Sequence, residues 1–171
     1  MLNKGLRIGL ASALFILAIW MFIEGEIGTG IMWFLLAGLV LLTYFRNERI
    51  LMSFWYLRKN NFEKAEGVID RIKNPEQSLI KSQLAYFYFL KGMIESQRGI
   101  GKAETMLKKA LNTGLRMKQD QAMAKLQLAG IAIAKRRKRE ATNLLAEVKK
   151  LDSKGLLDDQ VKYIKQGLKK I

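Results

Sequence analysis

The chain has no cysteine, no histidine and a single proline among its 171 residues. Without cysteine it forms no disulfide and offers no thiolate, and without histidine it lacks a common acid–base group and zinc ligand. No glycine-rich phosphate-binding loop follows any strand-like segment. Asp158 and Asp159 are the only adjacent carboxylates, and their position before an apolar-periodic segment indicates helix capping. We therefore expect no enzyme activity, no catalytic residues, no cofactor and no metal site.

Charge is scarce in the first 45 residues, where Lys4, Arg7, Glu24 and Glu26 are the only charged side chains. They leave two uncharged apolar runs, 8–23 and 27–45. At about 1.5 Å per residue the second run covers roughly 28 Å, close to the hydrocarbon core of a bilayer. The sequence therefore predicts that residues 1–45 form an uncleaved transmembrane helical hairpin.

Basic residues set the expected orientation of this hairpin. Lys4 and Arg7 precede the first span, Arg46 and Arg49 follow the second, and the connecting loop has no basic residue. The positive-inside rule then places both termini in the cytoplasm, most simply at a bacterial inner (plasma) membrane.

Small residues suggest where the hairpin packs. Gly5, Gly9 and Ala13 recur at every fourth position, so they form a stripe that could contact the second span or another membrane-protein subunit.

Residues 46–171 carry the whole net charge of +15. Such a charge suits anionic lipid, RNA or an acidic protein. One candidate partner-binding cluster is the run Lys135, Arg136, Arg137, Lys138 and Arg139. Lys162, Lys165 and Lys169 lie on one helical face and form a second candidate. The alternative is a solvated surface with no specific partner.

Apolar periodicity predicts that residues 46–171 are helical throughout. The expected helices cover residues 46–59 (continuous with the second span, with a bend near Asn47), 62–72, 76–97, 100–113, 116–135, 138–151 and 157–168. Asn74-Pro75 should end the second of them. Four aromatic residues, 86–89, lie in the third. Tyr86 and Tyr88 are candidate partner-binding residues, with packing in the core as the alternative.

A repeat runs through these helices. Ala65, Ala103 and Ala141 follow one another at one constant spacing, each early on a helix that begins after a turn. Gly92 recurs at the same spacing as Gly130. Small residues let antiparallel helices approach closely, so we expect all five to lie in packing contacts between the helices.

On these residues the chain resembles the tetratricopeptide repeat (TPR) family, whose units are helix–turn–helix pairs of about 34 residues. Ala65, Ala103 and Ala141 match the alanine of the family's second helix, and Phe62 matches the aromatic before it. Lys138 departs from that aromatic, and Gly92 and Gly130 lie one residue out of register. The resemblance implies an all-α protein, with a right-handed solenoid of about three repeats and a C-terminal capping helix over residues 46–171. Generic helical hairpins are the alternative.

The resemblance implies a membrane-anchored adaptor or scaffold that binds a protein or peptide, and the charge favours an acidic one. A basic docking factor that holds a ribosome, another RNA particle or an anionic lipid surface near a membrane complex is the second hypothesis. A third, an accessory subunit whose hairpin contacts other membrane proteins, is compatible with both.

Overall fold

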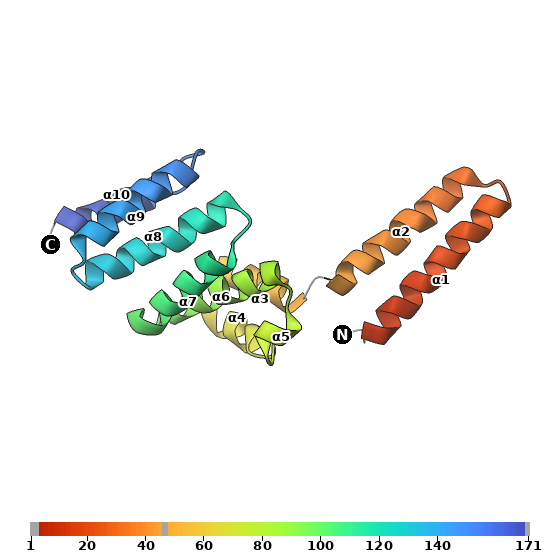
Figure 1. The fold of residues 1–171 in the computed structure, drawn as a ribbon, viewed down its shortest axis with the longest axis horizontal. Coiled ribbons are helices and arrows are strands. Elements are labelled where there is room, and N and C mark those ends of the chain that lie inside the picture. Colours follow the sequence, from red (N-terminus) through yellow and green to blue (C-terminus); the bar gives the residue numbers. More distant parts are fainter. Residues whose placement is uncertain (1–3, 46–47, 170–171) are drawn as a thin grey trace. The chain divides into compact units, whose positions relative to one another are not determined.

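The structure is a computed structural model that describes residues 4–45 and 48–169, with side chains described for residues 9–40 and 48–169. Over these ranges the chain is all-α, as predicted, and contains no strand (Figure 1). It divides into two compact units, Met1–Glu48 and Arg49–Ile171, slightly beyond the predicted boundary.

Unit 1 is an antiparallel pair of helices, α1 (Lys4–Ile23) and α2 (Ile27–Phe45). Gly25 adopts a positive φ of 81° in the turn between them, a conformation that glycine takes without steric cost. Small residues allow the two helices to pack closely, because Ala18 and Ala37 are buried between them. The rings of Phe15 and Phe34 lie 5.6 Å apart across the pair.

The two helices do not pack through the small-residue stripe that the sequence suggested. Gly9 and Ala13 are exposed, and a Cβ built on Gly9 would meet no atom within 4 Å. Gly5 lies outside the described side chains. Among the described side chains of α1, Ala11 and Ala18, two turns apart on one helix face, are the buried small residues. At about 100° per residue, Gly9 and Ala13 each lie roughly 200° around the helix from Ala11.

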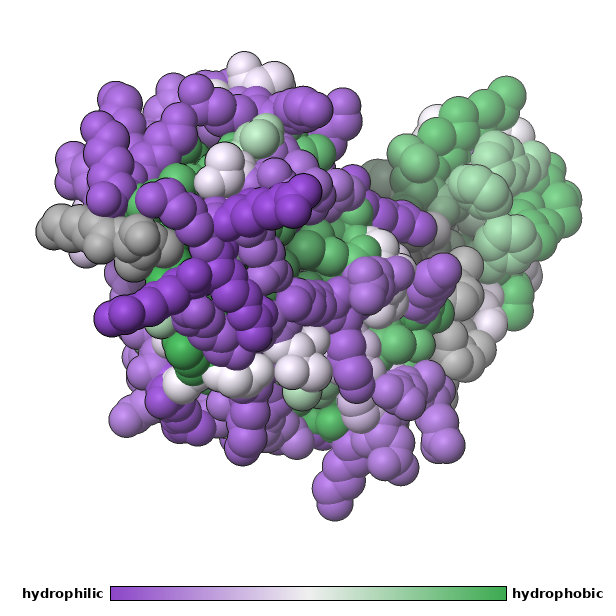
Figure 2. All heavy atoms as spheres, turned by 60° about the vertical axis from the view of Figure 1, so that its left-hand side comes forward, coloured by the Kyte–Doolittle hydropathy of each residue, from purple (hydrophilic) through white to green (hydrophobic). Residues whose placement is uncertain are grey.

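The outer surface of the hairpin is apolar. Between residues 9 and 40, large side chains that face outward include Ile16, Ile23, Ile27, Leu35 and Leu39, each more than 60% exposed. Figure 2 shows this surface as largely hydrophobic on its visible face. Within the described part of the chain, however, no helix is both long and apolar enough to cross a membrane. The predicted span 27–45 includes residues 41–45, whose side chains lie outside the described set.

Unit 2 is built from short helices joined by tight turns (Figure 1). They are α3 (Glu48–Arg58), α4 (Phe62–Ile69), α5 (Pro75–Ser78), α6 (Lys81–Glu95), α7 (Ile100–Thr113), α8 (Lys118–Ala134), α9 (Lys138–Leu151) and α10 (Asp158–Lys169). The predicted ranges of α7 and α9 match the structure. The expected continuity of α2 with α3, and the bend near Asn47, fall on residues 46–47, outside the described ranges.

Two predicted helices differ from the structure. α4 ends at Ile69 rather than at residue 72, and Pro75 starts the short helix α5 instead of ending α4. Proline suits this first position because its fixed φ is helical and its missing N–H is not needed there. The predicted helix 76–97 is interrupted at Leu79, which is extended (φ −114°, ψ 141°) and only 7% exposed. Burial of this side chain accompanies the break between α5 and α6.

The repeated alanines lie where the sequence placed them. Ala65, Ala103 and Ala141 are fully buried, one each on α4, α7 and α9. Gly92 of α6 is a close-contact position, because a Cβ there would lie 2.7 Å from Cγ of Leu107 in α7. Gly130 is less tightly packed, because a Cβ built there would lie 3.8 Å from its nearest neighbour, Cδ1 of Ile164 in α10.

The interior of unit 2 has two parts. The larger core, centred on the fully buried Phe89 and Leu90, joins residues of α4, α6, α7 and α8. A smaller core is closed by α10, which packs on α8 and α9 and buries Val161. The last helix therefore covers apolar surface that α8 and α9 would otherwise expose.

Candidate interaction site on the C-terminal helices

The predicted basic run, residues 135–139, forms the turn between α8 and α9. Arg136 adopts a left-handed conformation (φ 56°) and reverses the chain here. Between residues 135 and 171 there are twelve basic and five acidic residues, so this end of unit 2 is strongly positive. Figure 2 views unit 2 largely from this end and shows a predominantly hydrophilic surface.

Two side chains of the basic run, those of Lys135 and Arg137, bind the buried carboxylate of Glu104 on α7. Lys135 Nζ donates to Glu104 Oε2 at 2.5 Å, and Arg137 Nη1 donates to Oε1 at 2.9 Å. Lys108 donates to the same carboxylate at 2.6 Å. Glu104 is only 9% exposed. These hydrogen bonds, first that from Lys108, lower its pKa to about 2. Lys135 and Arg137 therefore join α7 to the α8–α9 turn and are not free for a partner.

The other three side chains of the run are exposed. Arg136, Lys138 and Arg139 form no ion pair with any residue that the structure describes. Lys138 and Arg139 border a shallow hollow on α9 that also includes Leu144 and Glu147. Lys125 of α8 forms an ion pair with Glu147. The available cations of the run are therefore three in number rather than five.

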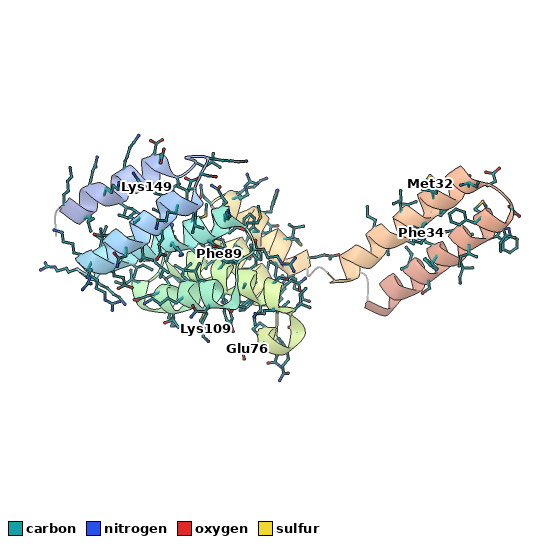
Figure 3. All side chains as sticks on the ribbon, turned by 45° about the horizontal axis from the view of Figure 1, so that its top comes forward. Met32, Phe34, Glu76, Phe89, Lys109 and Lys149 are labelled. Carbon is teal, nitrogen blue, oxygen red and sulfur yellow. The ribbon has the colours of Figure 1, made fainter. Side chains whose placement is uncertain are left out.

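The second candidate cluster, on α10, is also divided. Lys162 Nζ lies 3.4 Å from Asp159 Oδ1, and Lys169 is exposed. Lys165 instead faces Lys149 of α9 across a cleft between the two helices. The pKa of Lys165 is lowered, chiefly because Lys149 repels a second positive charge. Lys149, labelled in Figure 3, belongs to neither of the two clusters that the sequence predicted.

The two candidate tyrosines have partners within the protein. The hydroxyl group of Tyr88, a residue only 7% exposed, donates to Glu76 Oε1 at 2.7 Å. The hydroxyl group of Tyr86 donates to Asp120 Oδ2 at 2.7 Å, and burial together with this bond raises its pKa to about 12. Phe87 and Phe89 are buried as well. The structure thus places this aromatic run in the core and joins it to α5 and α8.

Neither a protein-family model, nor a curated protein, nor a solved structure matches this chain.

Proposed function

We propose that the protein is a membrane-anchored, TPR-like adaptor whose basic C-terminal helices bind an acidic protein at the cytoplasmic face. The observation that carries this proposal is the combination of an apolar hairpin with a repeat unit whose exposed cations lie in the α8–α9 turn and at the start of α9. Three buried alanines at one constant spacing support the resemblance to TPR units. Repeat proteins of this kind present extended surfaces that bind other proteins.

The exposed apolar surface of the hairpin supports the membrane anchor. A water-soluble protein rarely exposes a contiguous apolar surface of this extent, and such patches mark membrane or protein contacts. The charge-free sequence of residues 27–45 is long enough to span a bilayer core.

Helix α3, which begins shortly after α2 ends, supports a position near lipid. Its Leu51, Met52 and Trp55 side chains are 64%, 44% and 52% exposed. The Lys59 ammonium lies 3.8 Å from the centre of the Trp55 ring. An exposed tryptophan beside basic residues is typical of segments at a membrane interface.

The exposed cations Arg136, Lys138 and Arg139 support an acidic partner. They form no ion pair within the described ranges, so a partner's carboxylates would gain charge-assisted hydrogen bonds at small desolvation cost. The second candidate, a docking factor for an RNA particle, is favoured by Tyr163, which is 77% exposed among the lysines of α10. A base can stack on such a ring while lysines contact phosphates.

Purification of the full chain from its own cells in mild detergent tests the proposal. We expect an acidic protein to co-purify with the wild type and to be lost when Arg136, Lys138 and Arg139 are replaced by Glu. Arg137 stays unchanged, because it holds Glu104. The matched control replaces Lys64, Lys73 and Lys81, which are exposed on or near α4 and α6, by Glu.

Equal retention of the partner by both triple variants would contradict the proposal. Recovery of RNA in place of protein, with a steep decrease as salt rises, would favour the docking factor instead.

A further inference from the structure

Ion pairs connect successive repeats through an acidic residue that follows each of the first two buried alanines. Glu66 follows Ala65 on α4, and Arg98, in the turn before α7, donates to both its carboxylate oxygens at 2.6 Å. Glu104 follows Ala103 on α7 and accepts from Lys135 and Arg137, in the turn before α9. At each step a carboxylate on one helix therefore binds basic side chains from the turn that precedes the corresponding helix of the next repeat.

The third step of this series has no carboxylate. Thr142 follows Ala141 on α9, at the position in the repeat that corresponds to Glu104. Its hydroxyl group is already used, because it donates to the carbonyl oxygen of Lys138 at 2.9 Å. The acid that the repeat pattern predicts at this position is thus replaced by a neutral side chain.

Basic groups are nevertheless present next to Thr142. It lines the cleft between α9 and α10 together with Lys149 from α9 and Lys165 from α10. Neither lysine forms an ion pair with a residue in the described ranges. Asp158 attracts the Lys165 ammonium electrostatically but does not form an ion pair with it. The mutual repulsion that lowers the pKa of Lys165 is what an anion between the two ammonium groups would relieve.

The rest of the cleft is apolar and small. Leu145, Ala146 and Leu168 complete its lining, and its volume is about 210 Å³. Pockets for small-molecule ligands or cofactors usually exceed about 300 Å³. The cleft is therefore suited to one or two side chains, an anionic one at the lysines and an aliphatic one beside it.

We infer that the α9–α10 cleft receives an acidic side chain of the partner protein, with Lys149 and Lys165 binding its carboxylate and Leu145 and Leu168 contacting an adjoining aliphatic residue. The partner would thus supply the carboxylate that Thr142 does not. This inference rests on the proposed adaptor function and assigns that function a specific binding position.

A fluorescent peptide of alternating glutamate and leucine, titrated with the full chain in mild detergent, tests the cleft. The same peptide with glutamine in place of glutamate is the ligand control. We expect Lys149→Gln with Lys165→Gln to weaken binding of the glutamate peptide by about tenfold, as two partly exposed ion pairs are lost. The matched variant, Lys150→Gln with Lys154→Gln, removes the same charge outside the cleft and should weaken it less than about threefold.

A second variant restores the missing acid. Thr142→Glu should place a carboxylate against Lys149 and Lys165, raise the pKa of Lys165 in an NMR titration and weaken peptide binding. Ser153→Glu adds the same charge in the exposed loop after α9 and should do neither.

If the wild type binds the glutamate peptide, three results would overturn the inference. The first is an equal loss of affinity for the glutamate peptide in the two double lysine variants. The second is an unchanged affinity for that peptide in Thr142→Glu. The third is tighter binding of a uridine oligonucleotide than of the glutamate peptide, dependent on Lys149 and Lys165. If the wild type binds neither peptide while an acidic protein still co-purifies with it, the cleft is rejected and the adaptor function stands.

Discussion

Replacement of Gly92 by alanine tests the closest helix contact in unit 2. The added Cβ would lie 2.7 Å and 2.8 Å from Cγ and Cδ2 of Leu107, and 3.1 Å from its backbone nitrogen. Leu107 is fully buried, so its side chain has no solvent-exposed position to move to. Helix α6 or α7 would have to shift.

The expected cost follows from two opposing effects. Overpacking of a filled core costs about 1–3 kcal/mol, while removal of glycine from a helix returns up to about 1 kcal/mol. We expect Gly92→Ala to lower the free energy of unfolding by roughly 1–2 kcal/mol. Gly130→Ala, at the matching position of the next repeat, meets its nearest side chain at 3.8 Å, an ordinary contact. It should leave stability unchanged or raise it by up to about 1 kcal/mol.

The assay is urea denaturation of the full chain in mild detergent, followed by circular dichroism at the helix band and compared between the two variants. If Gly92→Ala is as stable as the wild type, or if Gly130→Ala is destabilised as much as Gly92→Ala, the account of the repeat packing is wrong.

Three further predictions concern hydrogen-bonded side chains. Because the folded-state pKa of Glu104 lies below its ordinary value of 4.5, its stabilisation is present above about pH 4.5 and is lost as pH falls toward 2. Lys108 and Arg137 are half-exposed, so water weakens their ion pairs, and we expect Glu104→Gln to lower the free energy of unfolding by about 1–2 kcal/mol at pH 7. The variant should also lose less stability than the wild type between pH 5 and pH 3 in urea denaturation. An equal loss in both proteins would contradict this. Tyr86→Phe should cost about 1–2 kcal/mol, because Asp120, 8% exposed, loses a donor. Since burial and this bond raise the pKa of Tyr86 to about 12, we expect the variant to lose tyrosinate absorbance at that end of an ultraviolet titration; loss of absorbance near pH 10 instead would argue against the bond. Ser53→Ala removes a fully buried hydroxyl group that donates to the Ala65 carbonyl oxygen at 2.9 Å; we expect a cost of about 1 kcal/mol in the same denaturation assay, and no change would show that the bond between α3 and α4 contributes nothing.

Local sequence determined much of the helical arrangement. Ala65, Ala103 and Ala141 could be predicted as packing residues, because a small side chain at a fixed spacing has a direct geometric consequence. Gly114 directly follows the predicted helix 100–113, and glycine at this position is a typical helix stop; its φ of 104° ends α7 as expected. Leu79 shows the limit of such reasoning, since its burial and extended backbone override the helical pattern around it.

The candidate site was less predictable, because ion pairs between distant residues decide which cations are available. Nothing local to residues 135–139 indicates that Lys135 and Arg137 bind Glu104, which lies on an earlier helix, while Arg136 does not. The repeat spacing does carry a signal, because Glu66 and Glu104 occupy the same position in successive repeats and Thr142 breaks the series. That signal becomes readable only when the structure shows which basic side chains each acid binds.

The central claim is that the hairpin crosses a membrane and holds the basic repeat unit on its cytoplasmic side. The chain has no cysteine, so single cysteines can be introduced by Gly28→Cys in the first turn of α2, next to the hairpin loop, and by Ser153→Cys in the loop after α9. A membrane-impermeant maleimide applied to intact cells should label the first variant and should label the second only after lysis. Labelling of Ser153→Cys in intact cells, or protection of Gly28→Cys until lysis, would contradict the account.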